Sequence, residues 1–227
     1  MKKIFTLIAV CAMVLTANAQ IVSSSSRSII TEKGTFSNYS RIFVSYTPMS
    51  FSGDVGKHLD TAPGMSLGWT SGWSVSKSVP VYVEGGVSLK YNWGKIAEEN
   101  DYYYGKYKSE FSYLGLIVPV SVSYKYSFPG AEGLSIAPFA GLHLTGNLLA
   151  KEKVTEGKEG SSETYNWFDK DDMGDDDTAK RIQFGWQVGL GLNYKALHLG
   201  FGYSADFTEI LDDVKTGGLM VSLGYNF

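Results

Sequence analysis

Apolar and polar residues alternate one by one along many segments of this chain, and this alternation restricts the fold more than any other feature. In RIQFGWQVGLGLNY, residues 181–194, every second side chain is large and apolar, and those between are polar or glycine. Successive side chains of a β-strand point to opposite faces, so the segment predicts a strand with one apolar and one polar face. No region after the first 20 residues shows a sustained helical period, and we therefore expect an all-β fold.

The alternation predicts eight strands joined by connections that are short and long in turn. Connections of this kind are typical of an antiparallel up-and-down meander with tight turns at one rim and longer loops at the other. The "FPGAEG" turn fits, because Pro129, Gly130 and Gly133 suit a tight reversal. The predicted strands are about 39–51, 63–75, 79–93, 110–127, 134–149, 181–194, 197–207 and 217–227. The long connections are about 52–62, 94–109, 150–180 and 208–216.

The composition of the two faces indicates which one points outward. An eight-stranded barrel encloses a lumen that side chains fill, and large residues such as Trp186 and Leu190 on every strand would overfill it. We therefore predict that the apolar face touches lipid, and that the charges pair inside, because an unpaired buried charge costs several kcal/mol. The fold class predicted is an eight-stranded antiparallel up-and-down transmembrane β-barrel. The polar residues expected inside include Glu84, Lys90, Lys125, Arg181, Gln183, Gln187, Asn193 and Asp206.

Aromatic residues gather near the ends of the predicted strands, where they would form interfacial girdles. At the short-turn rim these are Trp73, Tyr124, Tyr126, Tyr194 and Tyr225. At the long-loop rim they are Tyr91, Trp93 and Phe207.

The first residues, MKKIFTLIAVCAMVLTANAQ, predict a secretory signal peptide at 1–19. Residues 20–38 are expected to be a mobile N-terminal lead-in, and 39–227 the barrel domain. The one cysteine, Cys11, lies inside the signal. A lipid-attachment motif there is the alternative, but Val10 is bulkier than such a motif requires. Without Lys2 and Lys3 the 20 basic residues become 18 against 23 acidic ones, and a net charge near −5 argues against a nucleic-acid partner.

The last predicted strand, GGLMVSLGYNF, carries apolar or aromatic side chains at alternate positions up to Phe227. With this pattern the chain resembles the small outer-membrane β-barrel proteins of Gram-negative bacteria, the OmpA-like or porin-type barrel domain family. The resemblance implies a location in the cell outer membrane, with periplasmic termini and extracellular long loops, and contact with lipid and lipopolysaccharide. It also implies that the barrel-assembly machinery reads the strand that ends at Phe227, that the barrel is a monomer, and that any extracellular ligand binds the loops.

The three histidines give no catalytic motif. Lipid A deacylases of the outer membrane carry a His-x-Ser pair on one strand, whereas His58, His143 and His198 are followed at the second position by Asp60, Thr145 and Gly200. Thr145 beside His143 is nearest to that pair, but threonine is a poor substitute and the sequence shows no orienting carboxylate. We expect His143 to fill the lumen and predict no catalytic, cofactor-binding or metal-binding residue.

Two long loops carry unusual side chains. In "DKDDMGDDD", Asp169, Asp171, Asp175 and Asp177 can attract calcium or magnesium, but Met173 and Lys180 depart from the EF-hand pattern, and a solvated acidic loop is the favoured interpretation. The second loop carries tyrosines that suit a binding surface or mutual packing; these are Tyr102, Tyr103, Tyr104 and Tyr107.

The function predicted is that of an outer-membrane barrel with a structural role or a role in binding or adhesion through its surface loops, without evident catalysis. A narrow porin-like channel and a lipid-modifying enzyme are the alternatives. An open pore is disfavoured, because wide channels need about twice as many strands.

Overall fold

A computed structural model describes residues 36–54, 56–101, 105–156, 161–173 and 178–227. The predicted signal peptide and residues 20–35 of the lead-in lie outside this part. At the end of the lead-in, the Ser74 amide donates to Asn38 Oδ1 (2.9 Å) and the Phe36 amide donates to the Lys77 carbonyl (3.3 Å). These bonds tie residues 36–38 to the first short turn. No helix in the described part is long and apolar enough to cross a membrane.

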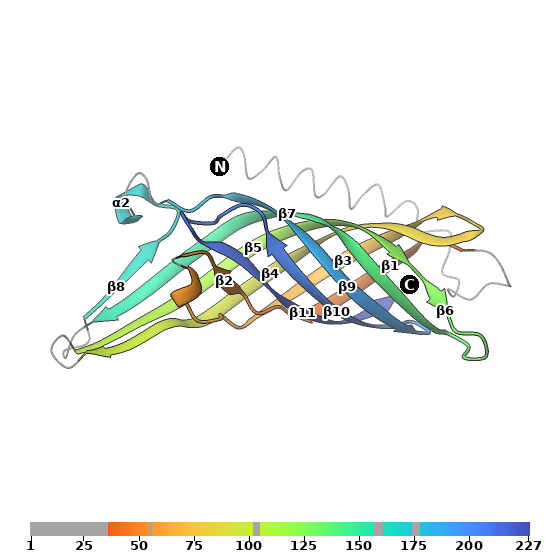
Figure 1. Cartoon of the computed structure of the whole chain (residues 1–227), viewed down its shortest axis with the longest axis horizontal. Coiled ribbons are helices and arrows are strands. Elements are labelled where there is room, and N and C mark those ends of the chain that lie inside the picture. The colour runs from red at the N-terminus through yellow and green to blue at the C-terminus, as the bar shows by residue number, and fades with distance from the viewer. Residues whose placement is uncertain (1–35, 55, 102–104, 157–160, 174–177) are drawn as a thin grey trace.

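Eight strands of the described chain form one closed antiparallel barrel in sequence order, which confirms the predicted fold (Figure 1). Two-residue to six-residue links near 77–78, 128–133 and 195–196 join strands at one rim, as predicted. Gly130 and Gly133 adopt positive φ values of 85° and 80°, which glycine allows at little steric cost. The barrel strands are β1 (Tyr39–Tyr46), β3 (Gly64–Ser76), β4 (Val79–Asp101), β5 (Gly105–Tyr124), β7 (Leu134–Glu156), β9 (Ile182–Tyr194), β10 (Leu197–Asp206) and β11 (Lys215–Asn226).

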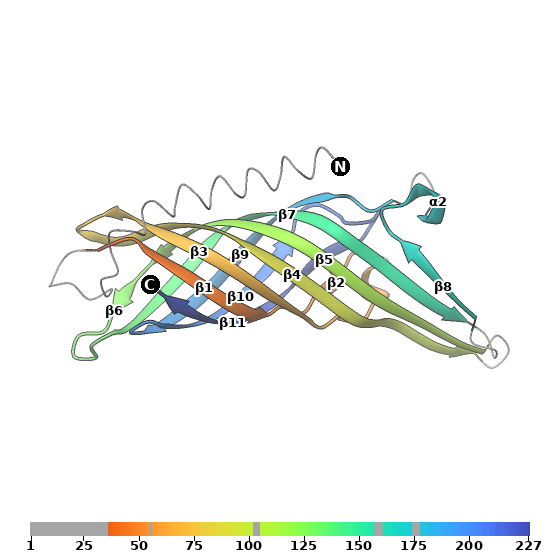
Figure 2. The same cartoon turned by 180° about the vertical axis from the view of Figure 1, so that it is seen from behind.

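The barrel closes where β1 pairs with β11, as Figure 2 shows from behind. Register pairs run from Arg41 opposite Asn226 to Tyr46 opposite Val221. Beyond the last pair, the Ser40 amide donates to the Phe227 carbonyl (2.9 Å) and the Phe227 amide donates to the Ser40 carbonyl (2.8 Å). The first and last strands therefore satisfy each other's backbone groups, as a bilayer demands.

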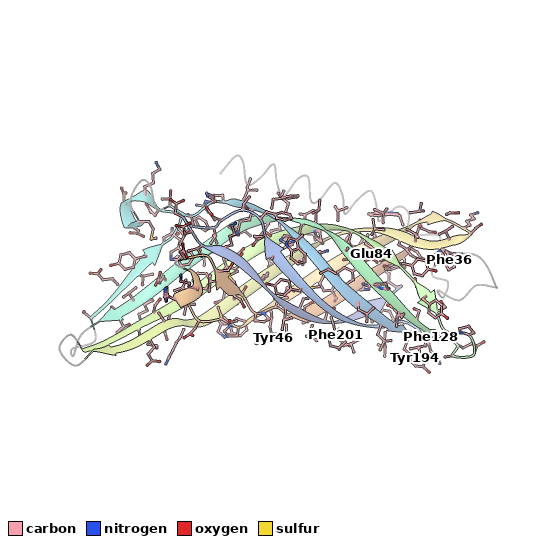
Figure 3. The ribbon with its side chains drawn as sticks, in the orientation of Figure 1. Phe36, Tyr46, Glu84, Phe128, Tyr194 and Phe201 are labelled. Carbon is pink, nitrogen blue, oxygen red and sulfur yellow. The ribbon has the colours of Figure 1, made fainter. Side chains whose placement is uncertain are left out.

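Exposure alternates along the strands in the predicted sense. On β1, Val44 and Tyr46 are 45% and 52% exposed, whereas Ser45 between them is 1% exposed. Tyr46, Tyr194 and Phe201 project away from the barrel in Figure 3, whereas Glu84 lies within its outline. An apolar surface on every strand suits hydrocarbon, so the outward direction of the large side chains is confirmed. The predicted girdle residues also point outward; these are Trp73, Tyr91, Trp93, Tyr124, Tyr126, Tyr194, Phe207 and Tyr225.

The long connections contain more secondary structure than predicted. Strands β4, β5 and β7 continue past their predicted ends at the long-loop rim, and β7 then pairs with β8 (Ser161–Asn166). The connections also contain the 3-10 helix η1 (Gly56–His58) and the helix α2 (Lys170–Met173). Two predicted strands are each divided: 39–51 into β1 and β2 (Ser50–Ser52), and 110–127 into β5 and β6 (Tyr126–Ser127). The extensions lack the alternation of apolar and polar residues from which the strands were predicted. The predicted strands therefore end where the membrane-facing part of the barrel ends.

Candidate functional site

The lumen holds a chain of hydrogen bonds that ends on one carboxylate, Asp206. The Tyr113 hydroxyl donates to Asn147 Oδ1 (2.5 Å), and Asn147 Nδ2 donates to Gln183 Oε1 (3.0 Å). Gln183 Nε2 then donates to Asp206 Oδ2 (3.3 Å), which also accepts from the Thr216 hydroxyl. The five residues come from β5, β7, β9, β10 and β11, so the network links most of the ring across the interior.

His143 is the remaining partner of Asp206. Its Nε2 lies 2.9 Å from Asp206 Oδ1, and both side chains are buried. Gly185 makes room for the ring, because a Cβ there would lie 2.5 Å from Nε2. The expectation that His143 lacks an orienting carboxylate is therefore wrong: β10 supplies one that sequence separation concealed. The predicted position of His143 in the lumen is confirmed, and Thr145 is buried beside it on β7.

A second polar group lies toward the short-turn rim. Glu84 Oε1 accepts from the Tyr39 hydroxyl (2.6 Å) and from the Ser123 hydroxyl. On neighbouring strands, Arg41 Nε donates to Asn226 Oδ1 (2.8 Å), and Asn193 Oδ1 lies 2.9 Å from Nδ1 of the buried His198.

Between the two groups lies a cavity of about 110 Å³. Its walls include charged side chains of both signs, among them Arg41, Glu84 and Lys90. The cavity can hold a few water-sized molecules, since each occupies about 30 Å³ in the liquid. Most polar residues predicted inside are therefore in the lumen. Arg181 is the exception and a correction: it lies exposed just before β9, with its guanidinium 4.0 Å from the centre of the Phe168 ring.

At the long-loop end of the barrel, apolar side chains from the long connections and the adjoining strands pack into a buried cluster, which we term the apolar cap. Its largest side chains are Trp167 and Phe111, whose ring centres are 4.8 Å apart. Trp167 Nε1 donates to Glu152 Oε2 (3.0 Å), and backbone bonds tie Trp167 to Ala150 and Ala179. The cap covers the mouth with packed apolar groups. Its buried members are Met49, Phe51, Ala62, Ile96, Phe111, Tyr113, Ala150, Trp167, Ala179, Ile210 and Val214.

Beyond the cap, β4, β5, β7 and β8 continue side by side past the ends of the other strands (Figure 1). We term residues 93–101, 105–112, 151–156 and 161–166 the extended sheet. One face carries Phe111 and Glu152, which contact Trp167 of the apolar cap. The other face, termed the charged face, carries Lys95, Glu98, Lys108, Glu110, Lys151 and Lys153.

Two ion pairs lie on the charged face. Lys95 Nζ is 2.9 Å from Glu98 Oε2. The hydrogen bond to Glu98 and the negative charge of Glu98 raise the pKa of the Lys95 ammonium. Lys108 contacts Glu110 and lowers the pKa of that carboxyl. The raised pKa of Lys95 and the lowered pKa of Glu110 both favour the ionised forms of these two groups.

The other predicted groups are only partly described. His58 lies exposed in η1, and in the acidic loop the Asp171 amide donates to Asp169 Oδ1 (3.1 Å). Asp175, Asp177 and Tyr102–Tyr104 lie outside the described residues, and the side chain of Tyr107 is not described. Within the described ranges, no three His, Cys, Asp or Glu side chains gather as a metal site. The sequence did not predict the apolar cap, because its members are scattered over the four long connections and the ends of two predicted strands.

No protein-family model and no curated protein matches the chain. Among solved structures, it is similar to the attachment invasion locus protein Ail of Yersinia pestis, solved with the heparin analogue sucrose octasulfate. That match has 18% identity and a TM-score of 0.47, and covers 85% of this chain and 100% of Ail. Neisserial surface protein A matches with 15% identity and a TM-score of 0.40, over 86% of this chain and 100% of that one. The outer membrane enzyme PagL matches with 10% identity and a TM-score of 0.35, over 80% and 97%. The described part of the present chain forms a closed ring of eight antiparallel strands with an outward apolar belt. This chain therefore has the fold of a small outer-membrane β-barrel.

Proposed function

We propose that this chain is an outer-membrane barrel that holds a rigid sheet above the membrane for binding at the cell surface. The observation that carries the proposal is the extended sheet, whose inner face is fixed by the apolar cap. Loops that only close a barrel need no core of their own, whereas a binding surface gains affinity when it is ordered in advance. The cap supplies that order.

The outer strand of the extended sheet is the part best suited to a partner. Strand β8 pairs with β7 along one side, and its four residues from Ser161 to Thr164 are exposed. An exposed strand at the side of a sheet can accept a further strand through main-chain hydrogen bonds. The same proposal places the long loops outside the cell, the termini in the periplasm, and a single chain in each barrel. It includes recognition of β11 by the barrel-assembly machinery.

The test removes the outer part of the sheet and keeps the cap. Replacing residues 154–163 by Asn-Gly removes the end of β7 and the first half of β8, and it retains Ala150, Glu152 and Trp167, which a deletion of all of 150–180 would lose. Cells that display the full chain should bind at least one surface in a panel of immobilised glycans and serum proteins more than cells without it. The shortened chain should return to the level of cells without it. Equal binding by both forms, or no binding by the full chain, would contradict the proposal.

Two alternatives have direct tests of their own. A narrow channel requires a path through the apolar cap, and planar-bilayer current above the leak of empty lipid would support it. A lipid-modifying enzyme would use the buried His143 with Thr145. If replacing both residues changes lipid A or phospholipids in the host membrane while the barrel still folds, the enzyme is favoured.

A further inference from the structure

Among the residues whose side chains the structure describes, the charged face is positive once its internal ion pairs are counted. Four lysines and two glutamates of this part lie on it, and Lys95 with Glu98 and Lys108 with Glu110 form two ion pairs. Lys151 and Lys153 belong to neither of these ion pairs. Both are exposed on β7, and among the described residues neither has a carboxylate within 4.0 Å.

Lys151 and Lys153 follow the apolar belt on their own strand, because Leu148 on β7 is exposed on the outward surface three residues before Lys151. Lys151 pairs in register with Ser112 on β5, and Ser112 pairs with Trp93 on β4. Trp93 is 40% exposed and stacks on Tyr91 with ring centres 5.6 Å apart, so this row marks the predicted girdle. Lys153 lies two residues further out on β7, which is about 7 Å along the strand and less along the membrane normal because barrel strands tilt.

That height matches the lipid headgroups. The polar layer adds about 5 to 8 Å beyond the hydrocarbon on each side. Below Lys151, the same outward surface of β7 continues into Leu148, Leu144 and Leu142, which are 38% to 48% exposed. A ligand that touches the lysines and this surface together has to carry negative charge at one end and acyl chains at the other.

We propose that Lys151 and Lys153 bind the phosphate groups of lipids in the leaflet on the long-loop side. Arg181 extends the site toward β9, because it is exposed and its Nη1 donates to the Leu148 carbonyl (3.4 Å). Lysine ammonium groups are point charges that bind phosphate without demanding one geometry. The site fixes the depth of the barrel and holds the base of the extended sheet against the membrane surface.

The proposal is tested with lipid A as the probe, by native mass spectrometry of the folded chain released from micelles. The chain should bind lipid A, and removal of the phosphates from lipid A should abolish most of that binding. The K151Q/K153Q variant should bind about 30-fold more weakly, because each lysine near an anionic surface contributes a factor of about 5. The K151R/K153R variant keeps both charges and should retain binding.

The matched control is K77Q/K195Q, which removes two exposed lysines from turns at the opposite rim. It should bind lipid A like the unaltered chain, and all variants should show the same heat-modifiable migration on gels. The proposal is overturned if the unaltered chain does not bind lipid A, if K151Q/K153Q binds as well as K77Q/K195Q, or if binding is indifferent to the phosphates. Displacement of lipid A by equimolar inorganic phosphate would overturn the lipid as ligand. These outcomes do not depend on any surface partner, so they are separate from the test of the proposed function.

Discussion

Nε2 of His143 lies 2.9 Å from Oδ1 of Asp206, which joins β7 to β10 across the interior of the barrel. The same carboxylate accepts from Gln183 and Thr216. This one carboxylate therefore has hydrogen-bond partners on three other strands, β7, β9 and β11. The lumen is held together by polar contacts in the place where a water-soluble protein would have an apolar core.

Replacing Asp206 by Asn should destabilise the barrel by about 3 kcal/mol, because the amide puts an N–H donor where the carboxylate accepted hydrogen bonds and leaves buried donors without an acceptor. The free energy of unfolding can be measured by urea titration of the chain in lipid vesicles. Asp212→Asn is the control, since Asp212 is exposed in the connection before β11. A loss no greater for Asp206→Asn than for the control would show that the network contributes little.

Replacing Trp167 by Ala should disorder the apolar cap and leave the barrel intact. Removal of a buried aromatic side chain from a packed cluster costs about 3–5 kcal/mol, and Trp167 is 2% exposed. Limited proteolysis should then cut the long connections quickly, while heat-modifiable migration stays unchanged. Trp93→Ala removes the same side chain from the outward surface and should leave the connections resistant. Equal resistance of both variants would mean that the cap does not order the loops.

Replacing Val188 by Arg should lower the free energy of unfolding by about 2–4 kcal/mol, whereas replacing Val79 by Arg should lower it by about 0–1 kcal/mol. The two values differ because the penalty for a charge on the lipid-facing surface depends on its depth in the bilayer. Both valines are 44% exposed, but Val188 lies in the middle of β9 and Val79 is the first residue of β4 beside a short turn. Reversible unfolding in vesicles measures both. Equal costs would contradict the placement of the bilayer along the barrel.

The membrane-facing part of the fold was predictable because two separate requirements act on the same residues. Strand geometry sets the alternation, and lipid on one side with a narrow lumen on the other fixes which face is large. Ile182 to Tyr194 obeys both rules, and the predicted and observed strands there differ by one residue. The closing of β1 on β11 followed from the need to pair every backbone group in lipid.

The apolar cap and the carboxylate beside His143 were not predictable by the same reasoning. Ile96, Trp167 and Ile210 belong to different connections, and no local period relates them. Asp206 is 63 residues from His143, so only the order of strands brings the two together. Arg181 follows the alternation of β9 by position, but the strand begins one residue later and frees it to lie over Phe168.

The five tryptophans allow contact between the outward belt of the barrel and hydrocarbon to be measured directly. Variants that retain one tryptophan each can be placed in vesicles whose acyl chains carry bromine, which quenches fluorescence on contact. Trp69 and Trp186, midway along outward rows, should be quenched most by bromine deep in the bilayer, and Trp73 and Trp93 by bromine near the headgroups. Trp167, buried in the apolar cap, should not be quenched. If Trp69 and Trp186 escape quenching at every depth, the apolar belt does not face lipid.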